Sequence, residues 1–381
     1  MAVKIVRQPN KIALLGTPTS AAAMEAGHEG APAALRAASL VERLRSIGYD
    51  VTDLGDDPAQ LYQPDEESPR ARNTARVLAA LNALKPRVEQ AIKSNALPLI
   101  LSGDCSVVLA TLAAARRYFR HVGLIYMDGD ADLQTPATTT SGSVDGMVIS
   151  HVVGRGAAEL VRFWSEPPLV REPDVALFGV HRLDAPEQQQ LDRSPLRRYL
   201  ADDVRRRGAR ATAAAAVERI HGNEYEFILH FDVDTIADFS ATNYPGPGGL
   251  RLEEAREALE VFATQKNLAA IEVTAYNPSK DPDGSSARLV VDLVTDILAK
   301  RLEALRPAAA PVEAVTAAAV QPAAGAPSEA PAAASPEIAA SVPAATPGEA
   351  WSSDSLSPEP SPAQPETEPA GTSSEPGDPQ S

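Results

Sequence analysis

The 381-residue sequence has a single cysteine, Cys105, few aromatic residues (4%) and no long uninterrupted apolar run. One cysteine excludes an intrachain disulfide framework and is typical of proteins in a reducing compartment. Without ~18 consecutive apolar residues the sequence offers no candidate membrane span, and its first residues do not have the pattern of a signal peptide. We therefore expect a cytoplasmic protein with no membrane partner.

Basic residues are absent from residues 307–381, which contain ten acids and 15 of the 33 prolines. Frequent prolines interrupt helices, and apolar residues larger than alanine are too sparse there to form a core. We predict a domain at residues 1–306 and a disordered acidic tail, rich in Ala, Pro, Ser and Glu, at 307–381. The tail is either a docking segment around Trp351 or a solvating extension with no partner.

The net charge of −16 falls to −6 when that tail is set aside. Binding to nucleic acid requires a basic face that neutralises phosphates, so a mildly acidic domain argues against a nucleic-acid partner.

Short apolar runs alternate with stretches in which apolar residues recur at helical spacing. The runs predict strands at 11–16, 49–54, 97–102, 122–127, 175–180, 226–231 and 268–274, and the helical spacing predicts helices at 31–46, 73–95, 106–118 and 285–305. This alternation predicts the α/β class, with a mainly parallel sheet covered by helices. Ligands of such sheets bind beyond the carboxyl ends of the strands.

Three of the predicted strands end in potential metal ligands. The segments are Ser102-Gly-Asp-Cys105-Ser, Asp128-Gly-Asp130-Ala-Asp132 and Asp232-Val-Asp234. Alternate residues of an extended segment point the same way, so the carboxylates of each segment can converge. Five carboxylates at one edge would repel one another and raise their pKa values unless a cation neutralises them. Oxygen-rich sites favour Mn²⁺ or Mg²⁺, and two ions explain five carboxylates better than one.

Each segment also has a purely structural interpretation. An Asp-x-Asp after a strand is often a solvated turn or a helix cap, and a lone cysteine is more often a small buried apolar residue than a ligand. A calcium loop is excluded, because Leu133 and Thr139 stand where that loop requires glycine and glutamate. Because three such segments end three strands of one predicted sheet, we favour a metal site.

These segments resemble the arginase/agmatinase/formimidoylglutamase (ureohydrolase) family over most of residues 11–305. The resemblance rests on Ser102-Gly-Asp-Cys-Ser, Met127-Asp-Gly-Asp-Ala-Asp-Leu-Gln-Thr-Pro, Thr138-Thr-Thr-Ser-Gly-Ser-Val-Asp-Gly-Met, Phe231-Asp-Val-Asp, Pro245-Gly-Pro-Gly-Gly-Leu and Tyr276-Asn-Pro, which match in order and spacing. It implies a three-layer α/β/α fold with a mainly parallel central sheet, and a catalytic domain at residues 1–306. It also implies two Mn²⁺ ions per subunit and a homo-oligomer, either a trimer or a hexamer.

The activity implied by the resemblance is that of a hydrolase acting on non-peptide C–N bonds of linear amidines. A hydroxide that bridges the metals attacks the guanidino or amidino carbon of an arginine-like amino acid, because metals generate a nucleophile at neutral pH and polarise the carbon. Asp128 and Asp232 match the bridging ligands, and Asp132 and Asp234 match ligands of one metal each. Cys105 and Asp130 stand where the family has histidine ligands. This more anionic set should bind cations more tightly, acidify bound water less and admit a softer metal beside Cys105.

Other positions match residues that handle the substrate. Asp145 matches a proton-relaying histidine, and its ordinary pKa of ~3.9 suits that catalytic role only if the site raises it. Ala275 stands where the family has a glutamate that grips the guanidinium. Glu272 cannot replace that glutamate, because three residues along a strand turn a side chain to the opposite face.

The resemblance also assigns the two ends of the amino-acid head. Gln134, Thr139, Ser141 and Ser143 match residues that bind an α-carboxylate, and Asp184 and Glu187 match residues that bind an α-amino group. Alternatively, Asp184 and Glu187 only cap the following helix. The alternative to a hydrolase is a non-catalytic arginase-like paralogue that retains the fold and metal binding. A metal-free Cys105 hydrolase would need a partner histidine, and none of the six histidines lies in a recognisable motif for that role.

Overall fold

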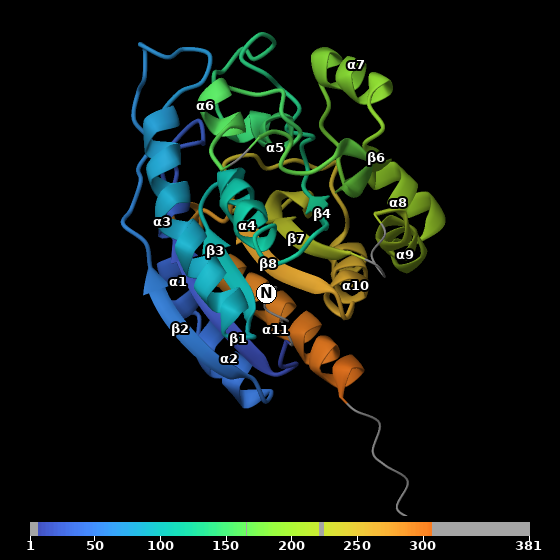
Figure 1. The fold of residues 1–381 in the computed structure, drawn as a ribbon. Coiled ribbons are helices and arrows are strands. Elements are labelled where there is room, and N and C mark those ends of the chain that lie inside the picture. The colour runs from blue at the N-terminus through green and yellow to red at the C-terminus, as the bar shows by residue number, and fades with distance from the viewer. Residues whose placement is uncertain (1–6, 165, 221–224, 307–381) are drawn as a thin grey trace, which may run out of the picture. The chain divides into compact units, whose positions relative to one another are not determined.

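An eight-stranded parallel sheet runs through the part of the chain that the structure, a computed structural model, describes: residues 7–164, 166–220 and 225–306 (Figure 1). The strands are β1 (Lys11–Thr17), β2 (Asp50–Asp56), β3 (Leu97–Ser102), β4 (Val122–Met127), β5 (Val175–Phe178), β6 (Arg197–Tyr199), β7 (Glu226–Asp232) and β8 (Leu268–Thr274). Their spatial order is β2-β1-β3-β8-β7-β4-β5-β6, and every neighbouring pair is parallel. The predicted fold class is confirmed. The predicted tail at 307–381 lies outside the described residues.

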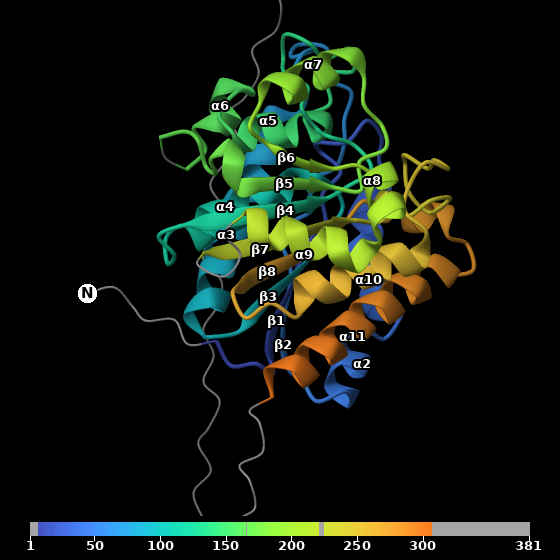
Figure 2. The ribbon, with the colours of Figure 1, turned by 90° about the vertical axis from the view of Figure 1, so that its right-hand side faces the viewer.

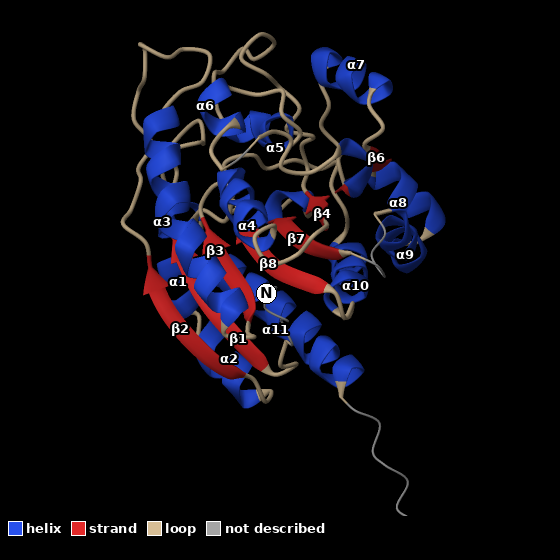
Figure 3. Cartoon of the chain, in the orientation of Figure 1, coloured by secondary structure: helices blue, strands red, loops and turns tan. Residues whose placement is uncertain are grey.

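Helices cover both faces of the sheet (Figures 2 and 3). The helices are α1 (Ala31–Ala37), α2 (Leu40–Ser46), α3 (Thr74–Lys93), α4 (Val108–Ala115), α5 (Val148–Val152), α6 (Ala158–Val161), α7 (Ala185–Arg193), α8 (Ala201–Arg207), α9 (Ala209–Arg219), α10 (Leu252–Ala263) and α11 (Ser285–Leu305). One apolar core joins the sheet to α1, α2 and α8–α11, and a second joins it to α3–α7. Among the described residues no helix combines the length and apolar character needed to cross a membrane.

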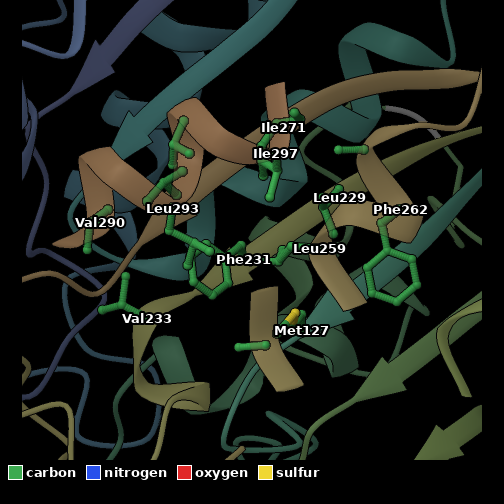
Figure 4. Close-up of a cluster of buried hydrophobic side chains, with 14 of the residues drawn as sticks. Met127, Leu229, Phe231, Val233, Leu259, Phe262, Ile271, Val290, Leu293 and Ile297 are labelled. Carbon is green, nitrogen blue, oxygen red and sulfur yellow. The ribbon is translucent and has the colours of Figure 1, made fainter. Parts of the chain in front are cut away.

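The side chains of β7 show why the sequences of the central strands are nearly continuous apolar runs. Leu229 and Phe231 pack against α10 and α11 with Leu259 and Leu293 (Figure 4), whereas Ile228 belongs to the core on the opposite face. A strand of a parallel sheet with helices on both faces is buried on both sides, so alternation of apolar and polar residues is lost. Burial on both faces holds the carboxyl end of this strand in a fixed position.

The boundaries of two predicted helices were wrong. Residues 31–46 form two helices, α1 and α2, because Ser39 between them has a left-handed backbone (φ 65°) that interrupts the hydrogen-bond ladder. The stretch predicted at 106–118 begins as a 3₁₀ turn at Cys105–Val107 and continues as α4 only to Ala115. Strand β6 and helices α5, α6 and α8–α10 were not predicted individually. Two of the three residues of β6 are exposed arginines, so it lacks the apolar run used as the strand signal.

Candidate metal centre

A cavity of about 730 Å³ lies at the carboxyl edge of the sheet. Cys105 begins the turn after β3, Asp128 directly follows β4, and Asp232 is the last residue of β7. Because parallel strands end at the same edge, these three segments meet although up to 127 positions separate their residues. All thirteen predicted site residues line the cavity: Cys105, Asp128, Asp130, Asp132, Gln134, Thr139, Ser141, Ser143, Asp145, Asp184, Glu187, Asp232 and Asp234.

The floor of the cavity brings together a thiol and several carboxylates. The Cys105 Sγ lies 3.0 Å from Asp232 Oδ2 and 3.9 Å from Asp128 Oδ2. One oxygen each of Asp128, Asp232 and Asp234 lies within 4.8 Å of the others, and all three residues are buried. The second oxygens of Asp128 and Asp232 accept bonds from the backbone N–H groups of Asp130 and Asp234 (2.7 Å each), which fixes both carboxylates. This oxygen-rich donor set, with one thiol beside it, fits a divalent cation.

Burial and mutual repulsion shape the electrostatics of these acids. Burial, then the neighbouring aspartates, hold the pKa values of Asp128, Asp132 and Asp232 well above their ordinary range. Burial raises the pKa of Asp234 to about 6, and the nearby Arg182 guanidinium opposes the rise. Without a cation these carboxyls retain protons at pH values where free aspartate has lost them. Cation binding therefore displaces protons.

Cys105 is poorly suited to act as a free nucleophile. Burial, then the charges of Asp232, Asp145 and Asp128, raise the pKa of its thiol well above the ordinary value. A nucleophilic cysteine needs an electropositive surrounding that lowers its pKa, which is the opposite situation. The acidic, buried surroundings of Cys105 therefore argue against a free thiol nucleophile and leave its role as a metal ligand open.

The carboxylate of Asp130, which lines the cavity with the other acids, is bound by Arg182, a residue that was not among the predicted site residues. Its two oxygens accept hydrogen bonds from Arg182 Nε (2.9 Å) and Nη2 (2.7 Å), and Arg182 also bonds Asp234. Arg182 lies in the loop between β5 and α7. The signal that could have found it is a single arginine placed just after a strand, two residues before Asp184, in a site otherwise rich in acids.

Asp132 and Asp145 also line the cavity. The Tyr126 hydroxyl donates to Asp132, whose backbone is left-handed (φ 50°). Asp145 Oδ1 accepts from the backbone N–H of Cys105 (2.9 Å), and burial followed by the charge of Asp104 raises the Asp145 pKa well above its ordinary value. A raised pKa is what a proton relay at neutral pH requires of a carboxyl group.

The predicted amino-acid head group site forms one wall of the cavity. Asp184 caps α7: its Oδ1 accepts from the Glu187 N–H (2.9 Å), and Glu187 Oε2 accepts from the Asp184 N–H (3.3 Å). Glu187 Oε1 accepts from Leu133 N (3.0 Å), and the Gln134 amide donates to Asp184. Asp184 and Glu187 therefore make the hydrogen bonds of a helix cap, and both side chains also line the cavity.

Three hydroxyl-bearing residues on the same wall have local partners. Ser143 Oγ donates to Ala22 O (2.7 Å), and Ser141 Oγ accepts from the Ser143 N–H (3.1 Å). Thr139 Oγ1 lies 3.4 Å from Ser141 Oγ. These hydroxyls are held in place and can still accept or donate toward the cavity.

The end of β8 contributes no acid to the cavity. Ala275 is buried with a left-handed backbone (φ 63°), and Glu272 points away into the core, as the strand geometry predicts. There Glu272 Oε2 lies 2.7 Å from His230 Nδ1, and both side chains are fully buried. His230 Nε2 contacts Thr274 Oγ1 (3.2 Å), which lies 3.4 Å from Cys105 Sγ. His230 was not among the predicted site residues; its signal in the sequence is one histidine inside an otherwise apolar strand.

Glu187→Gln should make the metal-free protein less sensitive to pH. Burial raises the Glu187 pKa to about 7. A raised acid pKa means that stability falls as pH rises from the ordinary value of ~4.5 through about 7. Glutamine stays neutral and preserves the capping box. We expect equal stability at pH 5, and a variant more stable by on the order of 2 kcal/mol at pH 8, measured by urea unfolding with chelator.

Glu303→Gln is the matched control, because Glu303 is exposed near the end of α11. It should follow the wild type at both pH values. If wild type and Glu187→Gln lose stability in parallel between pH 5 and 8, Glu187 is ionised without cost in the folded protein and the prediction is wrong.

Parallel strands covered by helices, with buried carboxylates at the ends of neighbouring strands, define an α/β protein with an acidic cluster at its sheet edge that could hold a cation. Comparison with known proteins is more specific. The Arginase family model matches residues 10–299, and the chain belongs to the arginase family. This confirms the resemblance found in the sequence.

Individual relatives agree with the family assignment. The chain is 28% identical to the arginase of Bacillus subtilis (strain 168) over 295 residues, which are 76% of this chain and 98% of that arginase. The solved structure of the arginase from Bacillus caldovelox superimposes with a TM-score of 0.70 at 27% identity, covering 76% of this chain and 98% of that one. The formimidoylglutamase of Bacillus subtilis shares the fold, with a TM-score of 0.63 at 18% identity and coverage of 80% and 89%.

Proposed function

We propose that this protein is a divalent-metal-dependent hydrolase that cleaves a C–N bond in the guanidino or amidino group of an arginine-like amino acid. The observation that supports this most strongly is the convergence of Asp128, Asp232 and Asp234 within 4.8 Å at the floor of the cavity. A divalent ion held there would lower the pKa of bound water, so that a nucleophile could form at neutral pH, and would polarise the carbon to be attacked.

The residues of this chain have separate tasks around that centre. Asp128 and Asp232 would hold the cation, with Cys105 beside it, while Asp234 lies close by and bonds Arg182. Asp145, whose pKa is raised well above its ordinary value by burial and then by the charge of Asp104, would pass a proton to the departing nitrogen. The cavity of about 730 Å³ is of the size that binds small molecules.

The polar wall favours an amino acid as substrate over a simple amine. Gln134, Thr139, Ser141 and Ser143 offer amide and hydroxyl groups that suit an α-carboxylate, and Asp184 with Glu187 offers carboxylates that suit an α-amino group. A zwitterionic head would satisfy both sets, whereas a plain amine leaves the hydroxyl set unpaired. That the metal is Mn²⁺ and that the chain forms trimers or hexamers stay predictions from the resemblance.

One observation favours the second candidate, a non-catalytic paralogue that retains the fold and metal binding. Ala275 contributes no carboxylate at the end of β8, where the family pattern has a glutamate, and Glu272 is buried against His230. A guanidinium substrate would therefore lack one of its partners. The two candidates agree on cation binding and differ only in turnover.

The deciding experiment measures product release and thermal stability on the same metal-loaded sample. The full chain is incubated with Mn²⁺, then supplied with arginine, N-hydroxyarginine, agmatine and guanidinobutyrate, and urea or hydroxyurea is quantified. We expect turnover of at least one α-amino acid, with kcat/KM at least ~10-fold above that for agmatine, because only the amino acid pairs with both polar sets. Metal-dependent thermal stabilisation with no turnover of any compound would refute the hydrolase and support the paralogue.

A further inference from the structure

The Arg182 guanidinium lies inside the acidic centre and bonds through all three of its nitrogens. Nε and Nη2 bind the two oxygens of Asp130 side by side (2.9 and 2.7 Å), and Nη2 also binds Asp234. Nη1 donates to the Tyr244 carbonyl oxygen (3.0 Å) and lies 3.1 Å from His181 Nε2. A two-point contact between a guanidinium and a carboxylate is among the strongest ion pairs in proteins. The arginine is a fixed positive charge at this place.

The backbone holds this arginine in register with its partner. The N–H groups of His181 and Arg182 both donate to the Gly129 carbonyl oxygen (2.9 and 3.0 Å), and Asp130 and Arg182 form an isolated parallel bridge. The segment after β5 is therefore tied to the segment after β4. The backbone segments that carry Asp130 and Arg182 are hydrogen-bonded to each other. The contact between the two side chains is therefore fixed by the fold.

The centre consequently has two unlike halves. On one side, Cys105 Sγ lies beside Asp232 and Asp128, and no arginine reaches these oxygens in the described structure. On the other side, Asp130 and Asp234 both bind Arg182. Asp130 occupies a position where the family pattern has a neutral histidine ligand. Its negative charge is cancelled by Arg182, so the Asp130–Arg182 pair is as neutral as the imidazole that it replaces.

We propose that the Arg182 guanidinium takes the place of a second divalent ion, and that this chain binds one divalent cation, between Asp128 and Asp232 on the Cys105 side. A second ion near Asp130 would have to displace a guanidinium held by four groups and would face its charge at contact distance. The remaining ligand set combines oxygen with one sulfur, which widens the range of metals from Mn²⁺ toward softer divalent ions. This proposal rests on the proposed metal centre and does not depend on turnover.

The test counts metal ions and asks whether they are magnetically coupled. The full chain is loaded with Mn²⁺, freed of loose metal by gel filtration, and analysed by elemental analysis and by electron paramagnetic resonance. We expect one Mn²⁺ per chain and the spectrum of an isolated ion. Arg182→Met keeps most of the aliphatic stem without the charge, and should bind a second Mn²⁺ and give the spectrum of a coupled pair. Asp130→His combined with Arg182→Met should bind the second ion more tightly.

Arg210→Met is the matched control. Arg210 forms an ion pair with Glu260 at the surface, so this variant should keep one uncoupled Mn²⁺. Two coupled Mn²⁺ ions in the wild type would overturn the proposal, even if Arg182→Met failed to fold. It would also be overturned if the wild type bound no Mn²⁺, or if both Arg182 variants folded and still held one ion. Absence of turnover with one ion bound would count against the proposed hydrolase only.

Discussion

Asp128→Asn should abolish hydrolysis and yet make the metal-free protein more stable. Asp128 Oδ2 lies 3.9 Å from Cys105 Sγ, and an oxygen of Asp128 lies within 4.8 Å of those of Asp232 and Asp234; an amide supplies a weaker, uncharged ligand there. Loss of the metal removes several kcal/mol of transition-state stabilisation, so turnover should fall by on the order of 10³-fold or more. Divalent-cation affinity should fall by at least ~100-fold, measured by titration calorimetry.

The gain in stability follows from the raised pKa of Asp128. Burial, then the charges of Asp234 and Asp130, raise it well above the ordinary value. The folded wild type therefore loses stability as pH rises from ~3.9 through the raised pKa, and asparagine removes that loss. In the presence of chelator the melting temperature of Asp128→Asn should exceed that of the wild type at pH 8, and match it near pH 4.

The metal reverses this order. Added Mn²⁺ should raise the melting temperature of the wild type and leave that of Asp128→Asn nearly unchanged. Asp296→Asn is the control, because Asp296 forms a surface ion pair with Arg256 and should respond to metal as the wild type does. Equal metal-dependent stabilisation of wild type and Asp128→Asn would show that the cation binds elsewhere.

Glu272→Leu should destabilise the fold by about 3–5 kcal/mol, because it breaks a fully buried pair. Glu272 and His230 have no exposed surface, and the His230 ring stacks on Tyr126 with ring centres 4.4 Å apart. Leucine cannot bond the His230 Nδ1, which would remain buried without a partner. Urea unfolding of the metal-free protein, at a pH where wild type and variant are both folded, measures the loss.

A double-mutant cycle separates the pair from simple loss of packing. His230→Phe should retain the stacking on Tyr126 and leave Glu272 without its partner, and His230→Phe combined with Glu272→Leu replaces the pair by two apolar groups. We expect the double variant to be more stable than either single variant, with a coupling energy of about 1–3 kcal/mol. Strictly additive losses would mean that the 2.7 Å contact contributes nothing to stability.

Much of the fold was predictable because its strongest signal is local. The strands at 97–102, 122–127 and 268–274 are buried on both faces and mostly apolar, and the structure has them with the predicted bounds. The final helix, Ser285–Leu305, was predicted with equal accuracy from its apolar spacing. The break at Ser39 was not, because one left-handed residue leaves the apolar periodicity on both sides intact.

The site was predictable to the extent that it is built from strand ends. Cys105, Asp128 and Asp232 each follow an apolar run directly, and parallel strands bring such positions to one edge whatever their separation in sequence. That logic, together with the family motifs, named thirteen residues that all line one cavity. The motifs alone were ambiguous for Asp184 and Glu187, since capping a helix and lining a cavity require the same residues at the same spacing.

The sequence by itself determined the class of fold, the family and the edge of the sheet at which the acids gather. Only the tertiary structure decided which acids face one another. Asp130, placed by its motif among the metal ligands, pairs with Arg182 from a loop 52 positions away, and Glu272 pairs with His230 across two neighbouring strands. Ion pairs of this kind depend on the register between strands and the direction of each side chain. Register and side-chain direction produce no periodic pattern in the sequence, whereas burial of a whole strand produces a recognisable apolar run.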